Sequence, residues 1–323
     1  MKRPPRLDLA HLPTPIESLP SLSAALSGPR LLVKRDDQTG LAFGGNKTRK
    51  LEYLCAAAQD AGADMLITAG AVQSNHCRQT AAAAARLGLD CILVLAGERP
   101  AQVSANNLLD GLLGAEIRWV AAEERDAQLQ AAFEQAQAQG RQPYLVPYGG
   151  SSPLGAAAYA FAIEEMLSQE CYPDWIVFAT SSGGTQAGLL AGSRLFGYEG
   201  RILGISVDEA AADLAPRVVT LANETIEFLD GVGPIEEKDV LINDSYLGAG
   251  YAVMGDPERE AIQLFARHEG LLVDPVYTGR AAAGLIDLIR QGYFNSDDSV
   301  LFWHTGGTPA IFADTFQQDL ATS

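Results

Sequence analysis

The sequence predicts an α/β protein built on open, mostly parallel twisted sheets that are flanked by helices. Two observations favour this fold class. From residue 31 to the C-terminus, short aliphatic or β-branched runs alternate with alanine-rich stretches of helical pattern, which is the order of βαβ units. The chain is also 323 residues long, which is enough for two packed domains or for one domain with a large insertion.

The elements follow from the length and composition of each run, because strands are short and rich in β-branched residues whereas helices are longer. The predicted strands are 31–33, 65–68, 91–95, 117–120, 144–146, 175–179, 202–206 and 300–303. The predicted helices are 51–61, 79–87, 124–139 and 154–167. The pattern predicts no clear element over residues 219–250.

Turn-rich stretches interrupt this alternation at residues 147–153 and 181–184. Clusters of Gly, Pro and Ser end regular elements, so each stretch is expected to be a crossover between domains or a ligand-binding loop. We therefore place one domain boundary near residue 155.

Composition excludes several classes of protein. The chain has 47% hydrophobic and 20% charged residues and no apolar run long enough to cross a bilayer, so a membrane protein is not expected. Its net charge of −17 disfavours nucleic acid as a partner. The N-terminal segment has no apolar signal core, so we expect a cytoplasmic location. The four cysteines show no CxxC spacing, which favours reduced thiols over disulfides or a metal site.

A lysine follows two glycines in Gly44-Gly45-Asn46-Lys47, at the predicted start of a helix. The free N–H groups and the dipole of a helix start favour a nearby anion. A lysine amine also forms Schiff bases with carbonyl cofactors when burial or neighbouring cations, such as Arg49 and Lys50, keep it neutral. These three basic residues are therefore candidates for holding one small anion, and the alternative is a solvated helix face.

A second glycine-rich turn, at residues 181–185, follows a predicted strand and precedes a helical pattern. Such a turn offers backbone N–H groups and hydroxyls to a phosphate. It is neither a Walker A loop nor a GxGxxG fingerprint, because the lysine of the first and the spacing of the second are missing. The alternative interpretation is an ordinary tight turn between a strand and a helix.

Polar side chains also follow the strand at 65–68, in the segment Gln73-Ser74-Asn75-His76. Ligands of parallel sheets bind outside the carboxyl ends of the strands, so substrate contacts are expected on this turn. Ser74 and Asn75 are equally suited to capping the helix that follows.

Five motifs, GGNKTRKLE, QSNH, SSGGTQAG, DPVYTGR and HTGG, occur in this order between residues 44 and 307. Together they resemble the D-cysteine desulfhydrase and 1-aminocyclopropane-1-carboxylate (ACC) deaminase family of tryptophan-synthase-β-like enzymes, which use pyridoxal 5′-phosphate (PLP). The resemblance implies fold type II of PLP enzymes, with a large domain of residues 1–49 and 156–323, a small inserted domain of residues 50–155, and the cofactor between them. It also implies a homodimer and a small amino-acid substrate.

The resemblance assigns roles to individual residues. Lys47 is implied to be the Schiff-base lysine, and the further catalytic residues are Ser74, Tyr251 and Tyr277. The residues implied around the cofactor are Lys47, Lys50, Asn75, Ser182, Gly183, Gly184, Thr185, Thr278 and Thr305. The residues implied around the substrate are Gln73, Ser74, Asn75, Tyr251 and Tyr277. No metal is implied.

Two positions depart from the family pattern. Gly250-Tyr251-Ala252 stands where the family usually has Gly-Tyr-Gly, which affects the placement of Tyr251. Arg280 stands where lysine is commoner, and we expect little consequence from this change on the assumption of a surface position.

Two further positions distinguish the activities within the family, because ACC deaminases typically carry Glu after DPVY and Leu within HxGG. This chain has Thr278 and Thr305 there, which favours β-elimination of D-cysteine to pyruvate, ammonia and hydrogen sulfide. An L-cysteate sulfo-lyase, which releases sulfite, and an ACC deaminase are the alternatives within the family. A NAD-linked α/β oxidoreductase is the alternative from another class, but the chain lacks the GxGxxG fingerprint.

Overall fold

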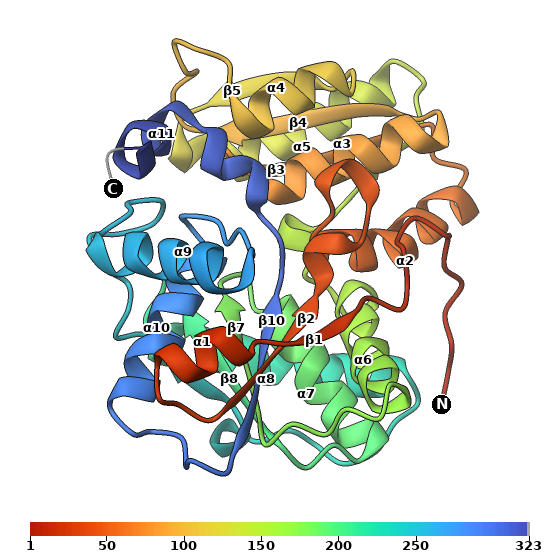
Figure 1. Ribbon diagram of the computed structural model, residues 1–323. Helices are drawn as coiled ribbons and strands as arrows, with labels where there is room; N and C mark the ends of the chain where they lie inside the picture. The colour runs from red at the N-terminus through yellow and green to blue at the C-terminus, as the bar shows by residue number, and fades with distance from the viewer. Residues whose placement is uncertain (322–323) are drawn as a thin grey trace.

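The computed structural model describes residues 1–321, and across these residues the strands form two sheets (Figure 1). One sheet has six strands in the order β1-β2-β10-β7-β8-β9. Its neighbouring strands run parallel except β1 and β2, which pair antiparallel. The other sheet has four parallel strands in the order β5-β4-β3-β6. The predicted α/β fold with open, mostly parallel sheets is therefore confirmed.

Each predicted strand overlaps a strand of the structure. The strands are β1 (Ile16–Ser18), β2 (Arg30–Arg35), β3 (Met65–Ala71), β4 (Asp90–Ala96), β5 (Glu116–Val120), β6 (Pro143–Leu145), β7 (Trp175–Thr180), β8 (Arg201–Ser206), β9 (Leu241–Asn243) and β10 (Ser299–His304). The sequence does not predict β1 and β9, because three residues are too few to show a period.

The four predicted helices correspond to α2, α3, α5 and α6. The helices are α1 (Pro20–Ala25), α2 (Asn46–Asp60), α3 (Asn75–Leu87), α4 (Ala105–Leu112), α5 (Arg125–Ala138), α6 (Pro153–Ser168), α7 (Gly184–Phe196), α8 (Ala211–Phe228), α9 (Asp256–Glu269), α10 (Thr278–Arg290) and α11 (Asp314–Ala321). Helix α8 extends to residue 228, into the region without a predicted element, and Pro216 interrupts its helical pattern just before that region.

Helices cover both faces of the six-stranded sheet (Figure 1). Successive side chains of β7 show the arrangement. Ile176 and Phe178 belong to the core formed with α6, α7 and α8, whereas Trp175 and Val177 belong to the core formed with α1, α9 and α10. Because both faces are buried, the strands of this sheet appear in the sequence as continuous apolar runs.

The four-stranded sheet is covered in the same way. Met65 and Ile67 of β3 pack with α5, and Leu66 packs with α2 and α3 on the other face. All four strands lie within residues 65–145. We propose residues 50–155 as the small domain and residues 1–49 with 156–323 as the large one, of which 322 and 323 lie outside the described residues. The segment Thr308–Phe312 nevertheless contacts α4, so the C-terminal part of the chain reaches across to the small sheet.

A buried carboxylate fastens α2 to the large sheet. Asp36 accepts hydrogen bonds from Nε and Nη2 of Arg49 on α2, at 2.9 and 2.8 Å. Tyr159 of α6 and Trp303 of β10 also donate to Asp36, at 2.5 and 2.8 Å. Arg49 pairs in addition with Glu165 at 2.8 Å. The expectation that Arg49 holds a small anion or lies on a solvated face is therefore wrong, because it neutralises carboxylates in the core.

Three further findings concern membrane spans, disulfides and metal sites. Within residues 1–321, no helix combines the length and the apolar character needed to span a bilayer. All four cysteines are buried and unpaired, as the sequence predicts. Over the same described residues, no group of three or more His, Cys, Asp or Glu side chains is arranged to hold a metal ion.

Candidate active site

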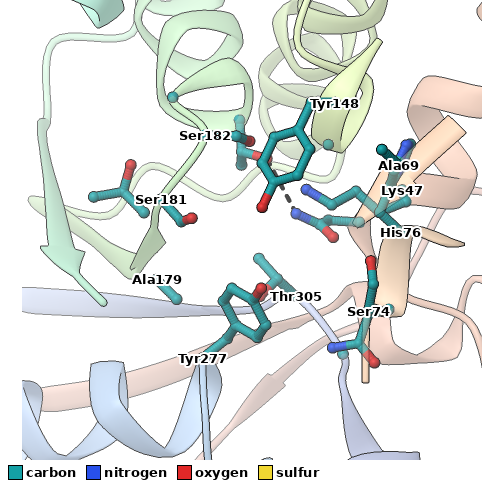
Figure 2. A pocket seen from close by; sticks show the side chains of 17 residues that line it. Lys47, Ala69, Ser74, His76, Tyr148, Ala179, Ser181, Ser182, Tyr277 and Thr305 are labelled. Carbon is teal, nitrogen blue, oxygen red and sulfur yellow. Dashed lines mark hydrogen bonds between the residues drawn. The ribbon is translucent and has the colours of Figure 1, made fainter. Parts of the chain in front are cut away.

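A cavity lies between the two sheets, where the N-termini of α2, α3 and α7 meet (Figure 2). It encloses about 670 Å³ of space, its open mouth included. Carboxyl ends of parallel strands and helix N-termini are where anionic ligands bind in such folds. The lining residues are Asn46, Lys47, Ala69, Ser74, Asn75, His76, Tyr148, Gly149, Ala179, Thr180, Ser181, Ser182, Gly183, Thr185, Tyr277, Thr305 and Gly306.

Lys47 lies in the first turn of α2, and its amine points into this cavity (Figure 2). Gly45 makes this entry into the helix possible, because its φ is +122° and a Cβ there would lie 2.8 Å from Nε2 of Gln79. Burial lowers the pKa of Lys47 to about 8, although the charge of Asp208 opposes the shift. A lysine with this pKa is partly neutral near pH 8, as a nucleophilic amine must be.

The start of α7 forms another wall, to which Ser182, Gly183 and Thr185 contribute. At Gly184 a Cβ would lie 2.5 Å from Oγ of Ser151 and 2.9 Å from Nζ of Lys50. Any side chain at position 184 would therefore push Lys50 away from the start of α7. The hydroxyls and the unpaired N–H groups of this helix start suit a phosphate.

Lys50 has a fully buried amine, and no carboxylate among residues 1–321 forms an ion pair with it. Its Nζ donates a hydrogen bond to the carbonyl of Gly149 at 3.1 Å. Burial, and then the neighbouring amine of Lys47, lower the pKa of Lys50 well below its ordinary value. An anion bound at the start of α7 would favour the charged form of this amine, so the residues present fit the phosphate of PLP.

Helix α3 presents its N-terminus to the same cavity. Ser74 is the N-cap, since its Oγ accepts a hydrogen bond from the backbone N–H of Cys77 at 3.1 Å, and it also lines the cavity. Asn75 follows it on the same wall. The two interpretations of Ser74 are therefore compatible, because it caps α3 and faces the ligand space. A helix N-terminus favours a carboxylate, so this wall suits the carboxylate of an amino acid.

Tyr277 lines the cavity, and Tyr251 contacts Tyr277 from the side away from the cavity. The two hydroxyls are hydrogen-bonded at 2.6 Å, and the rings meet edge to face. Burial raises the pKa of both hydroxyls, so both remain protonated near neutral pH. Tyr251 itself lines a second, neighbouring cavity that it shares with Tyr277. The structure thus places Tyr277 directly at the ligand space and Tyr251 as its partner.

The expected surface position of Arg280 is wrong, because the structure buries this side chain completely. Its guanidinium donates to the carbonyls of Gly250 and Val253, at 3.1 and 2.8 Å, on either side of Tyr251. Within this turn Ala252 has a φ of +60°, a conformation that side chains with a Cβ disfavour. Arg280 therefore holds the turn that carries Tyr251, at the point where the chain lacks the usual glycine.

Besides Lys50, Gly184 and Tyr251, which lie behind the cavity wall, two further predicted site residues do not line the cavity. The hydroxyl of Thr278 donates to Oδ1 of Asp274 at 2.7 Å, so it is used within its own turn. The side-chain carbonyl of Gln73 accepts a hydrogen bond from the backbone N–H of Asn106 at 2.9 Å, so it faces α4. Thr305, in contrast, lies on the cavity wall (Figure 2).

The cavity also includes residues that the sequence does not single out. The amide of Asn46 donates to Oγ1 of Thr185 at 3.1 Å and so joins the starts of α2 and α7. Tyr148 is 42% exposed and stands over the cavity in Figure 2. Its only signal in the sequence is the turn-rich stretch at 147–153, which fits a ligand loop as well as a domain crossover.

The sequence profile of the family described as pyridoxal-phosphate dependent enzyme matches residues 7–306, a span that includes every residue around the cavity. The chain therefore belongs to this family, and its cofactor is PLP. This agrees with the lysine amine and the anion site found in one cavity, and it confirms the predicted cofactor.

Within the family the chain is similar to particular proteins. It is 45% identical over 325 aligned residues to a D-cysteine desulfhydrase of Salmonella choleraesuis (strain SC-B67), with 97% of each chain covered. A D-cysteine desulfhydrase of Salmonella schwarzengrund (strain CVM19633) gives the same identity and coverage. The crystal structure of an ACC deaminase homologue is 38% identical with a TM-score of 0.90, covering 99% of this chain and 96% of that one. A PLP-dependent aspartate racemase, 17% identical with a TM-score of 0.68, shares the fold.

The lowered pKa of Lys47 gives a first testable prediction. In the cofactor-free enzyme, competitive labelling with acetic anhydride is expected to show half-maximal reactivity of Lys47 at about pH 8, because its amine loses its proton there. Lys238 is the control, since it is exposed and the hydrogen bond with Glu236 raises its pKa above the ordinary value. Peptide mass mapping measures both lysines in one sample. Equal titration of the two lysines would contradict the buried environment of Lys47.

Proposed function

We propose that the protein is a PLP-dependent carbon–sulfur lyase that converts D-cysteine and water into pyruvate, ammonia and hydrogen sulfide. The observation that carries the proposal is that the Lys47 amine shares one cavity with the anion site at the start of α7 and with Ser74 and Asn75 at the start of α3. An amino-acid enzyme of this cofactor class needs such a lysine, a phosphate site and a carboxylate site. The 45% identity to D-cysteine desulfhydrases supports the choice of substrate.

The first part of the reaction depends on Lys47. The start of α7 and Lys50 would hold the phosphate of PLP, and Lys47 would hold its carbonyl carbon. When bound, the cofactor supplies an electron sink that makes the α-hydrogen of the amino acid acidic. The start of α3 binds the substrate carboxylate, and the Lys47 amine, free once the substrate has taken its place, removes the α-proton. A pKa of about 8 suits this amine for accepting and returning a proton near neutral pH.

The second part breaks the bond between the β-carbon and sulfur, and sulfur leaves with the bonding electron pair. Tyr277 has a protonated hydroxyl in the cavity, which donates a hydrogen bond to the departing sulfur. Tyr251 holds that hydroxyl in place through the hydrogen bond of 2.6 Å. The unsaturated amino acid that remains is hydrolysed by water to pyruvate and ammonia.

The alternatives are an L-cysteate sulfo-lyase and an ACC deaminase. Thr278 and Thr305 stand where ACC deaminases typically have Glu and Leu, and Thr278 donates its hydroxyl to Asp274 at 2.7 Å. A glutamate there would remove this hydrogen bond and bring a second carboxylate against Asp274. The threonines at positions 278 and 305 therefore favour elimination of a good leaving group over the opening of a ring, as the family pattern implies.

Side-by-side assays of D-cysteine, L-cysteine, L-cysteate and ACC test the proposed substrate. We expect D-cysteine to react fastest, with sulfide and pyruvate formed in equal amounts. Sulfide and sulfite are measured separately, because a sulfo-lyase would release sulfite. The double change Thr278→Glu with Thr305→Leu is expected to lower desulfhydration, since it disturbs the turn at Asp274. Sulfite release from L-cysteate as the dominant activity would refute D-cysteine as the substrate and leave the role of Lys47 intact.

The proposed assembly is a homodimer, and this proposal rests on the family resemblance. Light scattering of the purified enzyme at micromolar concentration is expected to give twice the mass of the chain, and the mass of a single chain would contradict it. We also propose that the enzyme acts in the cytoplasm, because its four thiols are buried and unpaired, the state that a reducing compartment maintains.

A further inference from the structure

Helix α4 begins against the turn that follows β3, and its first residues form a dense hydrogen-bond network with that turn. Asn106 and Asn107 are both buried. Asn107 donates its amide to the carbonyl of Val72 at 2.5 Å, and its own side-chain carbonyl accepts from Nε2 of Gln73 at 3.0 Å. The turn 72–75, which leads into the cavity wall at Ser74 and Asn75, is thus held from outside the cavity by α4.

Asn106 makes the contact that reaches the cavity. Its Nδ2 donates to the backbone carbonyl of Gln73 at 2.8 Å and to Oδ1 of Asn75 at 2.9 Å. A backbone carbonyl can only accept, so the atom of Asn106 that faces Gln73 must be the NH₂ group. The atom of Asn75 that meets the same NH₂ group must then be its oxygen. The NH₂ group of Asn75 is consequently left as the donor that this side chain can offer to a ligand.

The backbone around Asn106 shows that this arrangement is built into the fold. Ala105, the residue before it, has a φ of +50°, a left-handed conformation that residues with a Cβ disfavour. Such a conformation persists only where the surrounding contacts determine it. Here the backbone N–H of Asn106 donates to the side-chain carbonyl of Gln73 at 2.9 Å, which fixes the start of α4 on the turn.

We propose that Asn106 is a positioning residue that turns the NH₂ group of Asn75 towards the cofactor and substrate. Asn106 does not line the cavity and acts through Asn75, which lines it together with Lys47. The hydrogen bonds of Asn106 do not depend on the proposed function. The expected effect on catalysis rests on it. A donor directed from Asn75 stabilises an anionic oxygen of the cofactor or of the substrate, whereas a reversed amide would place a carbonyl oxygen against it.

The test compares Asn106→Ala, Asn106→Asp and Asn107→Ala as holoenzymes with bound PLP. Asn107 is the matched control, because it has an equally buried amide on the same helix turn and makes no hydrogen bond to Asn75. The readouts are the visible absorbance of the lysine-bound cofactor, its dependence on pH, the melting temperature, and kcat and KM separately. We expect both Asn106 variants to shift the absorbance and its pH midpoint and to lose roughly 10- to 100-fold in kcat/KM.

Asn106→Asp is expected to have the larger effect, because a carboxylate cannot donate and forces the amide of Asn75 to reverse. Asn107→Ala should lower the melting temperature to a similar degree while keeping the wild-type absorbance. In an Asn75→Ala background, a change at Asn106 should leave the absorbance where Asn75→Ala alone puts it. This last comparison remains decisive if Asn106→Asp folds poorly.

Wild-type absorbance and pH midpoint in the Asn106 variants, with only the melting temperature lowered, would overturn the proposal. So would equal absorbance shifts for Asn106→Ala and Asn107→Ala, because the effect would then be loss of packing. A shifted absorbance in the Asn106 variants of an enzyme that does not act on D-cysteine would support the positioning role and refute the proposed substrate.

Discussion

Lys47→Ala is expected to abolish the visible absorbance of the bound cofactor and to reduce turnover of D-cysteine by roughly 1,000-fold or more, since it removes both the covalent attachment and the proton-transferring amine. Lys47 carries its amine on the wall of the cavity, and burial lowers the pKa of this amine to about 8. Absorbance spectroscopy measures the first effect, and assays of sulfide and pyruvate measure the second. Borohydride reduction of the wild-type enzyme and peptide mapping should place the cofactor on Lys47.

Lys50→Ala is the matched control, because Lys50 is a buried lysine one turn further along α2. This change removes the buried amine that the phosphate would pair with but leaves the Lys47 amine. We therefore expect weaker cofactor binding and recovery of the visible absorbance when PLP is in excess. Mapping of the adduct to Lys34 or Lys50 would refute the assignment of Lys47. Lys34 is an unsuitable alternative in this structure, because its Nζ is paired with Glu165 at 2.6 Å.

The fold could be predicted from the sequence because its central strands are separate apolar runs that are buried on both faces. β7 illustrates this, since every residue from Trp175 to Thr180 is buried and the run is bounded by turn residues. The edge strands β1 and β9 have three residues each and half-exposed side chains, so they leave no periodic signal. The site residues on glycine-rich turns could be predicted for a similar local reason, because Gly45 and Lys47 lie two positions apart in one motif.

The remaining parts of the site depend on contacts between distant segments. Asn106 acts on Asn75, which is 31 positions away in the chain. Arg280 holds Val253, 27 positions away, and a basic residue in a helical pattern is otherwise typical of a surface. The side chain of Gln73 turns to α4 rather than to the cavity for the same reason. The sequence indicates which residue types are present at these positions, but only the packing of α4 and α10 determines what they contact.

Asp36→Asn is expected to lower the free energy of unfolding by about 3–5 kcal/mol, as removal of one partner from a buried ion pair does. The carboxylate is fully buried and accepts hydrogen bonds from Arg49, Tyr159 and Trp303. An asparagine keeps the shape but turns an NH₂ group against these donors and leaves Arg49 with Glu165 alone. Glu164→Gln is the control, since Glu164 is partly exposed and pairs with the exposed Arg3, so a loss of at most about 1 kcal/mol is expected.

The pH dependence of the free energy of unfolding shows whether Asp36 stabilises the fold through its charge or only through its packing. Burial on its own would raise the pKa of Asp36, but the charge and hydrogen bonds of Arg49 outweigh it and hold the pKa below its ordinary value. A carboxyl whose pKa is lowered by folding contributes stability above its unfolded pKa of about 4, and this contribution is lost as the pH falls through the lower folded pKa. Denaturant unfolding of Asp36→Asn should therefore lose less stability than the wild type when the pH is lowered below about 4. Parallel pH dependence of the two proteins would show that Asp36 is not the charged anchor that holds the Lys47 helix to the large sheet.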